Sequence, residues 1–188
     1  SFVDSRERYD AGTEFQIGRI EMVANTGTYI DTPYHRYADG EDLADVGLER
    51  VCDLPGLVID VRERGRVIGP EVLDGFEVAG RAVLVLTGWD RHWRTDAYFE
   101  GHPHLTEAAA LLLRDRGAAL VGLDSYNIDD VSGGARPVHS VLLGAGIPIV
   151  EHMTRLADLP ADGFRFTAAP PKVRGMGSFP VRAHARIG

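Results

Sequence analysis

Residues 82–87 read Ala82-Val83-Leu84-Val85-Leu86-Thr87, a short apolar run with no glycine or proline inside it. Continuous apolar runs of this length are typical of strands that are covered on both faces, whereas half-exposed strands alternate polar and apolar side chains. Similar runs occupy 57–61, 119–124 and 147–151. We therefore expect a central sheet whose main strands are buried on both sides.

Helical patterns lie between these runs. The clearest covers 106–116, where Thr106 can cap the N-terminus and Gly117 can end the helix in a left-handed conformation. Shorter helices are expected to begin at Pro70 and to cover 139–144. Because strands and helices interleave along the chain, we predict the α/β class with a mixed sheet.

The sequence also predicts one more strand, the position of the strand at Pro148, and the roles of three carboxylates at strand ends. Residues 15–23 alternate well enough to form a half-buried strand. Pro148 lacks a backbone donor, so its strand is expected to lie at an edge of the sheet or to begin irregularly. Asp124 and Glu151 each close an apolar run, and strand ends of open α/β sheets line ligand crevices. Asp60 also closes a run, but a charged stretch follows it, so we expect it to cap a turn or to be solvated.

The composition indicates one globular domain over residues 1–188. Of the 188 residues 44% are hydrophobic, which is enough for a core without disulfides or a structural metal. The formal net charge of -8 repels phosphate backbones and anionic lipid, so we expect neither nucleic acid nor a membrane as a partner. The only cysteine, Cys52, excludes an intramolecular disulfide, fits a reducing cytoplasmic setting and is expected to be a small buried hydrophobe.

The densest group of polar side chains lies at 25–35, which reads Asn25-Thr26-Gly27-Thr28-Tyr29-Ile30-Asp31-Thr32-Pro33-Tyr34-His35. In an extended chain Asn25, Tyr29 and Asp31 share one face, and a glycine between them leaves room for close approach. Pro33 turns the chain and can return His35 over the same face. The stretch predicts an active-site wall that carries an amide, a phenol, a carboxylate and an imidazole.

This stretch resembles the signature His-Thr-Gly-Thr-His-x-Asp-x-Pro-x-His of the cyclase family, which includes bacterial kynurenine formamidase, isatin hydrolase and some polyketide cyclases. Asn25 and Tyr29 stand where the family has its two leading histidines. A second segment, from His139 to Glu151, resembles the His…Leu-Leu…Gly-Ile-x-Ile-x-Glu run of the family, and 101–109 and 121–125 follow in the family's order. The matching signature positions are Thr26, Gly27, Thr28, Asp31, Pro33 and His35.

The resemblance covers about residues 20–160 and implies a swivelling β/β/α fold assembled as a homodimer or homotetramer. Relatives carry an extra N-terminal strand, so the first segment of this chain is expected to be missing or shortened. The implied activity is hydrolysis of a carbon–nitrogen bond in a formyl amide or cyclic amide, or of a lactone. The family's best-known role is the formamidase step of tryptophan catabolism.

The resemblance also implies a metal site. Relatives hold one or two divalent ions with the signature residues and the later His and Glu, and Asp31, His139 and Glu151 keep those positions here. One nitrogen and two carboxylate ligands still match a hydrolytic site with an open water position, so we expect Mn or Zn and no organic cofactor. If no metal binds, one carboxylate takes a proton or a cation such as Arg36 or Arg136 enters the site.

Three functions remain open from the sequence. In a metal-dependent hydrolase, His35 would act as general base or proton shuttle, as the family's signature histidine does. In a metal-independent cyclase or dehydratase, His35 and Tyr29 would carry out the acid–base chemistry. In either enzyme, Asn25 is expected to contact the substrate. In a non-catalytic member, the fold would bind a ligand and no reaction would follow.

The aromatic segment at 89–93 has two interpretations. Trp89 and Trp93 can form a lid over an aromatic or cyclic small-molecule substrate, or they can pack in a surface loop. The loop at 124–130 is expected near the cleft, since it follows a strand end. Structural or surface positions are expected for His102, His104, His152 and His184.

Overall fold

The computed structural model describes residues 2–188 and contains a mixed eight-stranded sheet in the order β10-β8-β2-β4-β6-β7-β1-β9. Strands β2, β4, β6 and β7 pair in parallel, while β1, β8, β9 and β10 join antiparallel on the two sides. A small parallel pair, β3 with β5, lies apart from this sheet. The strands are β1 (Tyr29–Asp31), β2 (Leu54–Asp60), β3 (Val67–Ile68), β4 (Ala82–Leu86), β5 (His104–Leu105), β6 (Leu120–Leu123), β7 (Ile149–Glu151), β8 (Phe164–Thr167), β9 (Ser178–Pro180) and β10 (His184–Ile187).

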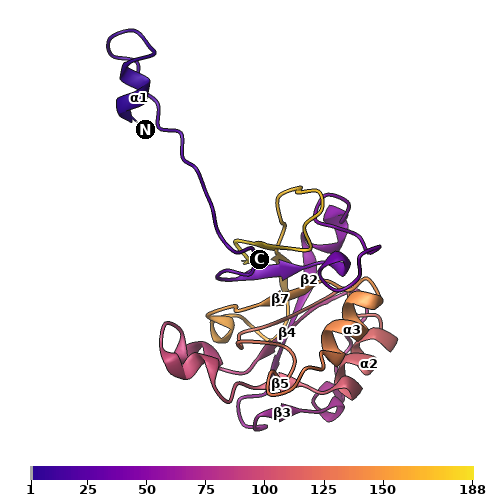
Figure 1. Ribbon diagram of the computed structural model, residues 1–188. Helices are drawn as coiled ribbons and strands as arrows, with labels where there is room; N and C mark the ends of the chain where they lie inside the picture. Colours follow the sequence, from indigo (N-terminus) through magenta and orange to yellow (C-terminus); the bar gives the residue numbers. More distant parts are fainter. Residues whose placement is uncertain (1) are drawn as a thin grey trace.

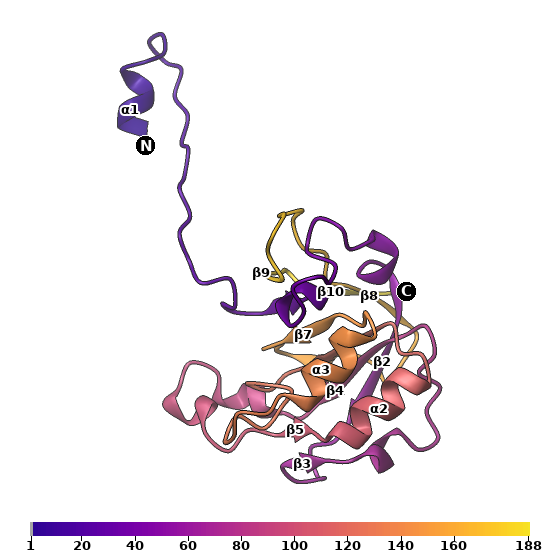
Figure 2. The same ribbon diagram turned by 45° about the vertical axis from the view of Figure 1, so that its right-hand side comes forward.

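Helices are few, and the two that pack on the body lie side by side on one face of the sheet (Figures 1 and 2). The amide of Ala109 donates to Thr106 Oγ1 at 3.2 Å, which confirms the predicted cap of α2. The α-helices are α1 (Phe2–Arg6), α2 (Glu107–Asp115) and α3 (Pro137–Gly144). Single turns of 3-10 helix cover Pro33–His35, Leu48–Arg50, Pro70–Leu73, Trp89–His92, Asp96–Phe99 and Leu156–Asp158.

The central strands are buried on both faces, as their continuous apolar runs predict. In β4, Val83 and Val85 join the core cluster that also contains residues of α2 and α3. Leu84 points to a second cluster on the opposite face, which contains no residue of either helix. Alternate side chains of β4 therefore pack into two hydrophobic clusters, one on each face of the sheet. The predicted α/β class with a mixed sheet is confirmed.

The predicted strand at 15–23 is wrong. These residues form no strand, and Ile17 and Ile20 expose 78% and 83% of their surface. In both views they belong to an arm that extends away from the body (Figures 1 and 2). An alternating pattern forms a strand only where a neighbouring strand supplies hydrogen bonds and a core to cover, and no strand of residues 2–188 pairs with this segment.

The other local predictions have mixed outcomes. The helix expected from Pro70 is one turn of 3-10 helix. Pro148 does not lie at a sheet edge, because β7 stands between β6 and β1, but the strand begins only after it, at Ile149. Asp60 is exposed and pairs with Arg62, as expected of a solvated residue. Within residues 2–188, none of the helices has the length and apolar character that crossing a bilayer requires.

Candidate active site and metal centre

Strand pairing brings the predicted site residues together from distant parts of the chain. β1 lies antiparallel to β7, with Tyr29 opposite Glu151, and Asp31 follows two positions later on the same face of β1. α3 supplies His139 beside them. A cavity of about 210 Å³ opens at this point. It is lined by Asn25, Tyr29, His35, Arg36, Asn127, Arg136, His139 and Glu151.

Asp31 is fully buried and keeps one carboxylate oxygen unpaired. The hydroxyl of Ser178 donates to Oδ1, and the amide of Asn25 lies 3.5 Å from the same oxygen. Oδ2 has no hydrogen-bond donor and lies 3.6 Å from Nε2 of His139. A buried carboxylate oxygen without a donor is costly, so this atom marks a position where a cation would be stabilised.

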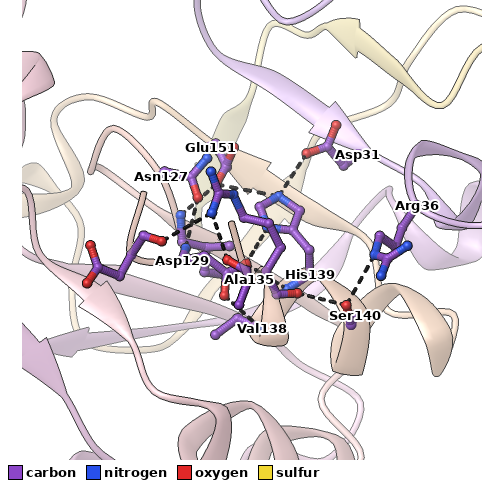
Figure 3. A network of polar contacts seen from close by, with 12 residues as sticks. Asp31, Arg36, Asn127, Asp129, Ala135, Val138, His139, Ser140 and Glu151 are labelled. Carbon is purple, nitrogen blue, oxygen red and sulfur yellow. Dashed lines mark hydrogen bonds and ion pairs between the residues drawn. The ribbon is translucent and has the colours of Figure 1, made fainter. Parts of the chain in front are cut away.

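A second carboxylate orients His139. Asp129 Oδ2 lies 2.6 Å from Nδ1 of the ring, and the amides of Val138 and His139 donate to Asp129 at 2.8 and 3.0 Å (Figure 3). These amides belong to the first turn of α3, where the helix has no acceptors of its own and favours a negative charge. Asp129 therefore stays an acceptor and holds the proton on Nδ1, which leaves Nε2 turned toward Asp31 and Glu151.

Glu151 is fully buried and accepts two hydrogen bonds. The Tyr29 hydroxyl donates to Oε2 at 2.5 Å, and the amide of Ile128 donates to Oε1 at 2.6 Å. Oε1 also lies 3.8 Å from Nε2 of His139. Burial raises the pKa of Glu151, and the charge of His139 opposes that rise only in part. Burial and the nearby carboxylates also raise the pKa of Tyr29, so its phenol keeps its proton and acts as a donor.

Without a cation, a protonated His139 offsets part of the negative charge of the buried carboxylates Asp31, Asp129 and Glu151. Burial lowers the pKa of this imidazole, but the hydrogen bond with Asp129 and the nearby carboxylates of Asp31 and Glu151 raise it more, and the net direction is upward. From the sequence, the other expectation for a metal-free site is that Arg36 or Arg136 pairs with one of the carboxylates. Among residues 2–188, however, no ion pair joins Arg36 or Arg136 to a site carboxylate. Arg36 donates to Ser140, and Arg136 donates to backbone carbonyls, so this alternative finds no support.

His35 stands at the open side of the site. It ends the 3-10 turn after β1, and its side chain is 36% exposed at the cavity. Its Nδ1 lies 2.8 Å from Ser178 Oγ and 3.5 Å from Asp31 Oδ1. Ligand atoms of Asp31, His35 and His139 all lie within 4.8 Å of one another. This group of potential metal ligands has His35 in the place of the predicted Glu151.

The predicted aromatic lid does not line the cavity. Trp89 donates its indole N–H to the carbonyl of Tyr98 at 2.9 Å, and Trp93 packs edge-on against the Tyr98 ring. Trp93 contacts His152, which in turn contacts Tyr29, so the tryptophans belong to an aromatic layer behind the site. Direct substrate contact by Trp89 and Trp93 stays a prediction.

Asp129 and Ser178 are site residues that the sequence did not reveal. The loop at 124–130 was expected near the cleft, and Asn127, Ile128 and Asp129 confirm that placement. Nothing in the sequence singles out Asp129 among the carboxylates of this loop. Ser178 enters through the pairing of β9 with β1, which joins residues 147 positions apart, so no local pattern could indicate it.

Comparison with known proteins decides the family. The family model Cyclase, described as "Putative cyclase", matches residues 4–130. A kynurenine formamidase from Bacillus cereus is 31% identical over 171 residues, which cover 90% of this chain and 79% of that protein. The chain belongs to the cyclase family.

Solved structures agree with this assignment. An isatin hydrolase bound to the product analogue thioisatinate is 25% identical, with a TM-score of 0.76 over 85% of this chain and 70% of that one. A predicted metal-dependent hydrolase from Bacillus stearothermophilus is 29% identical, with a TM-score of 0.66 over 88% of this chain and 78% of that one. The relatives of this cyclase-family chain support an enzyme of the hydrolase class, and the expected cyclase-type fold is confirmed.

Proposed function

We propose that this cyclase-family chain is a metal-dependent hydrolase of small cyclic or aromatic amides. Its divalent cation is held by Asp31, His139 and Glu151. The observation that carries the proposal is the buried Oδ2 of Asp31, which lacks a donor and faces Nε2 of His139. Together with Glu151, these atoms converge from β1, α3 and β7 on one point beside the cavity.

The residues present fit a cation. His139 offers Nε2 because Asp129 fixes its other nitrogen, and a carboxylate behind a ligating histidine is a common support of metal sites. Asp31 and Glu151 supply oxygen atoms, which Mn²⁺ accepts as readily as Zn²⁺ does. A bound cation supplies Lewis-acid polarisation of a carbonyl and a lowered pKa for water.

The remaining residues have separate tasks. The Ser178 hydroxyl donates its single proton to Asp31, so it accepts from Nδ1–H of His35. In the neutral His35 ring, Nε2 is then the acceptor. We assign His35 as the general base that takes a proton from the attacking water. Tyr29 keeps its proton and holds Glu151, while Asn25 lines the cavity and can donate its amide to a substrate carbonyl.

The names of the relatives indicate the bond that is broken. One is a kynurenine formamidase and another an isatin hydrolase, so a formyl amide on an aromatic ring and a cyclic amide fused to one are the two substrate types to test. The proposal also includes a cytoplasmic location, which the single free cysteine favours.

The test is hydrolysis of N-formylkynurenine and isatin by the purified full chain with Mn²⁺ or Zn²⁺. We expect turnover by the unaltered chain and by the Asp60→Asn control, whose carboxylate is exposed. Asp31→Asn should lose the metal and at least 100-fold in kcat/KM. His35→Gln should lose a similar factor and keep the metal, as removal of a general base costs about 10²–10⁴-fold.

Two results would overturn parts of this proposal. If no formyl amide or cyclic amide is hydrolysed by the metal-loaded chain, the hydrolase assignment is wrong. If His35→Gln also loses the metal, His35 is a ligand, as its place near Asp31 and His139 allows, and the assignment of the base is wrong. Turnover of an activated substrate by the chelated chain would favour the metal-independent cyclase, for which the replaced signature histidines are the motivating observation.

A further inference from the structure

Two arginines line the cavity without an acidic partner. Arg36 and Arg136 both belong to the cavity wall, and within residues 2–188 neither guanidinium forms an ion pair with a carboxylate. Other arginines of this chain, whose net charge is -8, do find such partners, as Arg62 does with Asp60. Positive charge that is left unpaired at a cavity attracts an anion.

Arg36 is held at one edge and free at the other. Its Nε–H donates to Ser140 Oγ on α3 at 3.2 Å, beside His139 (Figure 3). Its guanidinium carbon also lies 5.3 Å from the centre of the Tyr37 ring. The N–H groups on Nη1 and Nη2 have no acceptor among residues 2–188. This end of the side chain can therefore donate to a ligand without giving up a contact.

Arg136 is anchored in a similar way. Its Nη1 donates to the carbonyls of Gly133 and Ala135 at 2.8 and 2.7 Å, and to that of Asp130 at 3.3 Å. These bonds fix the side chain against the loop that precedes α3. Nε and Nη2 donate to no atom of the described chain, so this edge is free. Two N–H groups on one edge of a guanidinium form the fork that fits the two oxygens of a carboxylate.

The charges of the proposed metal site do not compensate the two arginines. Asp31 and Glu151 match the two charges of a divalent cation, and Asp129 is engaged with amides of α3 and the ring of His139. Of residues 2–188, Glu151 is the only carboxylate that lines the cavity. The negative group that the two guanidiniums lack therefore has to come from a ligand.

We propose that Arg36 and Arg136 bind a carboxylate of the substrate, so that the chain selects amides that carry one. This inference rests on the proposed hydrolase function and adds the part of the substrate away from the bond that breaks. Arg36 directly follows His35, and Arg136 precedes the helix that supplies His139. A carboxylate held there would fix the position of the reacting carbonyl beside these histidines. Of the two substrate types, a formyl amide with an acidic side chain uses both arginines, whereas neutral isatin does not.

The kinetic test compares N-formylkynurenine with its carboxamide, in which a neutral amide replaces the carboxylate. The metal-loaded chain should have a kcat/KM about 10-fold or more higher for the carboxylate, as loss of hydrogen bonds to a charged group implies. Arg36→Gln should lose about the same factor on N-formylkynurenine, chiefly through KM, and should act on the carboxamide as the unaltered chain does. Arg36→Lys should recover part of the loss, because lysine keeps the charge but not the fork. The control is Arg64→Gln, an exposed arginine that does not line the cavity.

A binding measurement separates this inference from the proposed function, because it needs no turnover. In calorimetric titrations, kynurenine should bind about 10-fold tighter than kynurenine carboxamide, with and without a chelator. Arg36→Gln and Arg136→Gln should each reduce this preference. Circular dichroism checks that Arg136→Gln, which gives up its contacts with the loop, keeps the fold. If this preference is found in a chain that hydrolyses neither amide, the hydrolase assignment fails and the carboxylate site stands.

Three results would overturn the inference. The first is equal binding of the two ligands, or binding of neither. The second is an equal loss on both substrates in Arg36→Gln, which would place this arginine at the reacting carbonyl. The third is a preference that chelation abolishes and both arginine variants keep, which would place the carboxylate on the metal.

Discussion

Asp129 shows how one side chain links the fold to the chemistry of the site. Its carboxylate accepts from two amides in the first turn of α3 and lies 2.6 Å from the ring of His139. The helix end favours the negative charge, and that charge fixes which ring nitrogen of His139 carries the proton. The geometry of the proposed metal site therefore depends on a residue outside the set Asp31, His139 and Glu151.

Asp129→Asn should lower the affinity for Mn²⁺ or Zn²⁺ by about 10–100-fold, because the amide is a weaker acceptor for Nδ1–H of His139. A competition titration with a chelating dye measures the affinity. The control is Asp130→Asn, which removes a neighbouring carboxylate that pairs with Arg66 at the surface. Equal affinities in the two variants would show that Asp129 does not support the ligand.

Tyr29 illustrates a change of role between the sequence and the structure. The sequence predicted acid–base chemistry for its phenol. In the structure the hydroxyl donates to Glu151, and burial is the main cause that raises the pKa of the phenol further from neutrality. A phenol that keeps its proton acts as a hydrogen-bond donor to Glu151. Its contribution is to hold a buried carboxylate, as a charge-assisted hydrogen bond can.

Tyr29→Phe should lower the free energy of unfolding by about 1–3 kcal/mol while kcat falls no more than about tenfold, because the hydrogen bond is lost and the base remains. Urea denaturation and steady-state kinetics measure the two quantities. Tyr37→Phe is the control, since its hydroxyl donates to the Ser140 carbonyl outside the cavity. A fall of 1,000-fold or more in kcat with normal metal content would restore Tyr29 as a catalytic group.

At the scale of elements, local sequence patterns correctly predicted the buried strands and helix α2. The strands at 54–60, 82–86, 120–123 and 149–151 follow continuous apolar runs, and α2 follows a cap, an apolar centre and a glycine stop. The segment 15–23 has the alternation of a strand, but pairing depends on a neighbour that the pattern does not specify. The same limit hid Ser178, whose place is set by strand register across the chain.

The cap of α2 gives an element-scale prediction. Thr106→Ala should lower the free energy of unfolding by about 1 kcal/mol, because the amide of Ala109 loses its acceptor. Chemical denaturation measures the change. Thr95→Ala serves as the control, since the Thr95 hydroxyl donates to a carbonyl in an exposed loop. A change in Thr106→Ala no larger than in the control would contradict the capping role.

At the scale of the whole molecule, buried histidines couple stability to pH. His102 is fully buried, its Nε2 lies 3.1 Å from the carbonyl of Asp129, and its Nδ1 has no partner among residues 2–188. Burial lowers the pKa of this imidazole below its ordinary value of 6.5. The unfolded chain then binds a proton more readily than the folded one, so stability falls as the pH drops below 6.5.

His102→Gln should flatten this acid dependence. One proton is worth at most about 1.4 kcal/mol per pH unit, so the variant should lose less stability than the unaltered chain between pH 7.5 and 5.5. Urea unfolding at the two pH values measures the difference, with the exposed His184→Gln as the control. Parallel pH slopes in His102→Gln and the unaltered chain would mean that His102 does not contribute.

The measurement that tests the central claim most directly is the metal content of the full chain. Plasma mass spectrometry is applied after loading with Mn²⁺ or Zn²⁺ and gel filtration, to the unaltered chain, Asp31→Asn and the exposed control Asp60→Asn. We predict near-stoichiometric metal in the unaltered chain and the control, and loss of the metal in Asp31→Asn. An unaltered chain that stays empty, or an Asp31→Asn variant that loads equally well, would contradict a cation between Asp31 and His139.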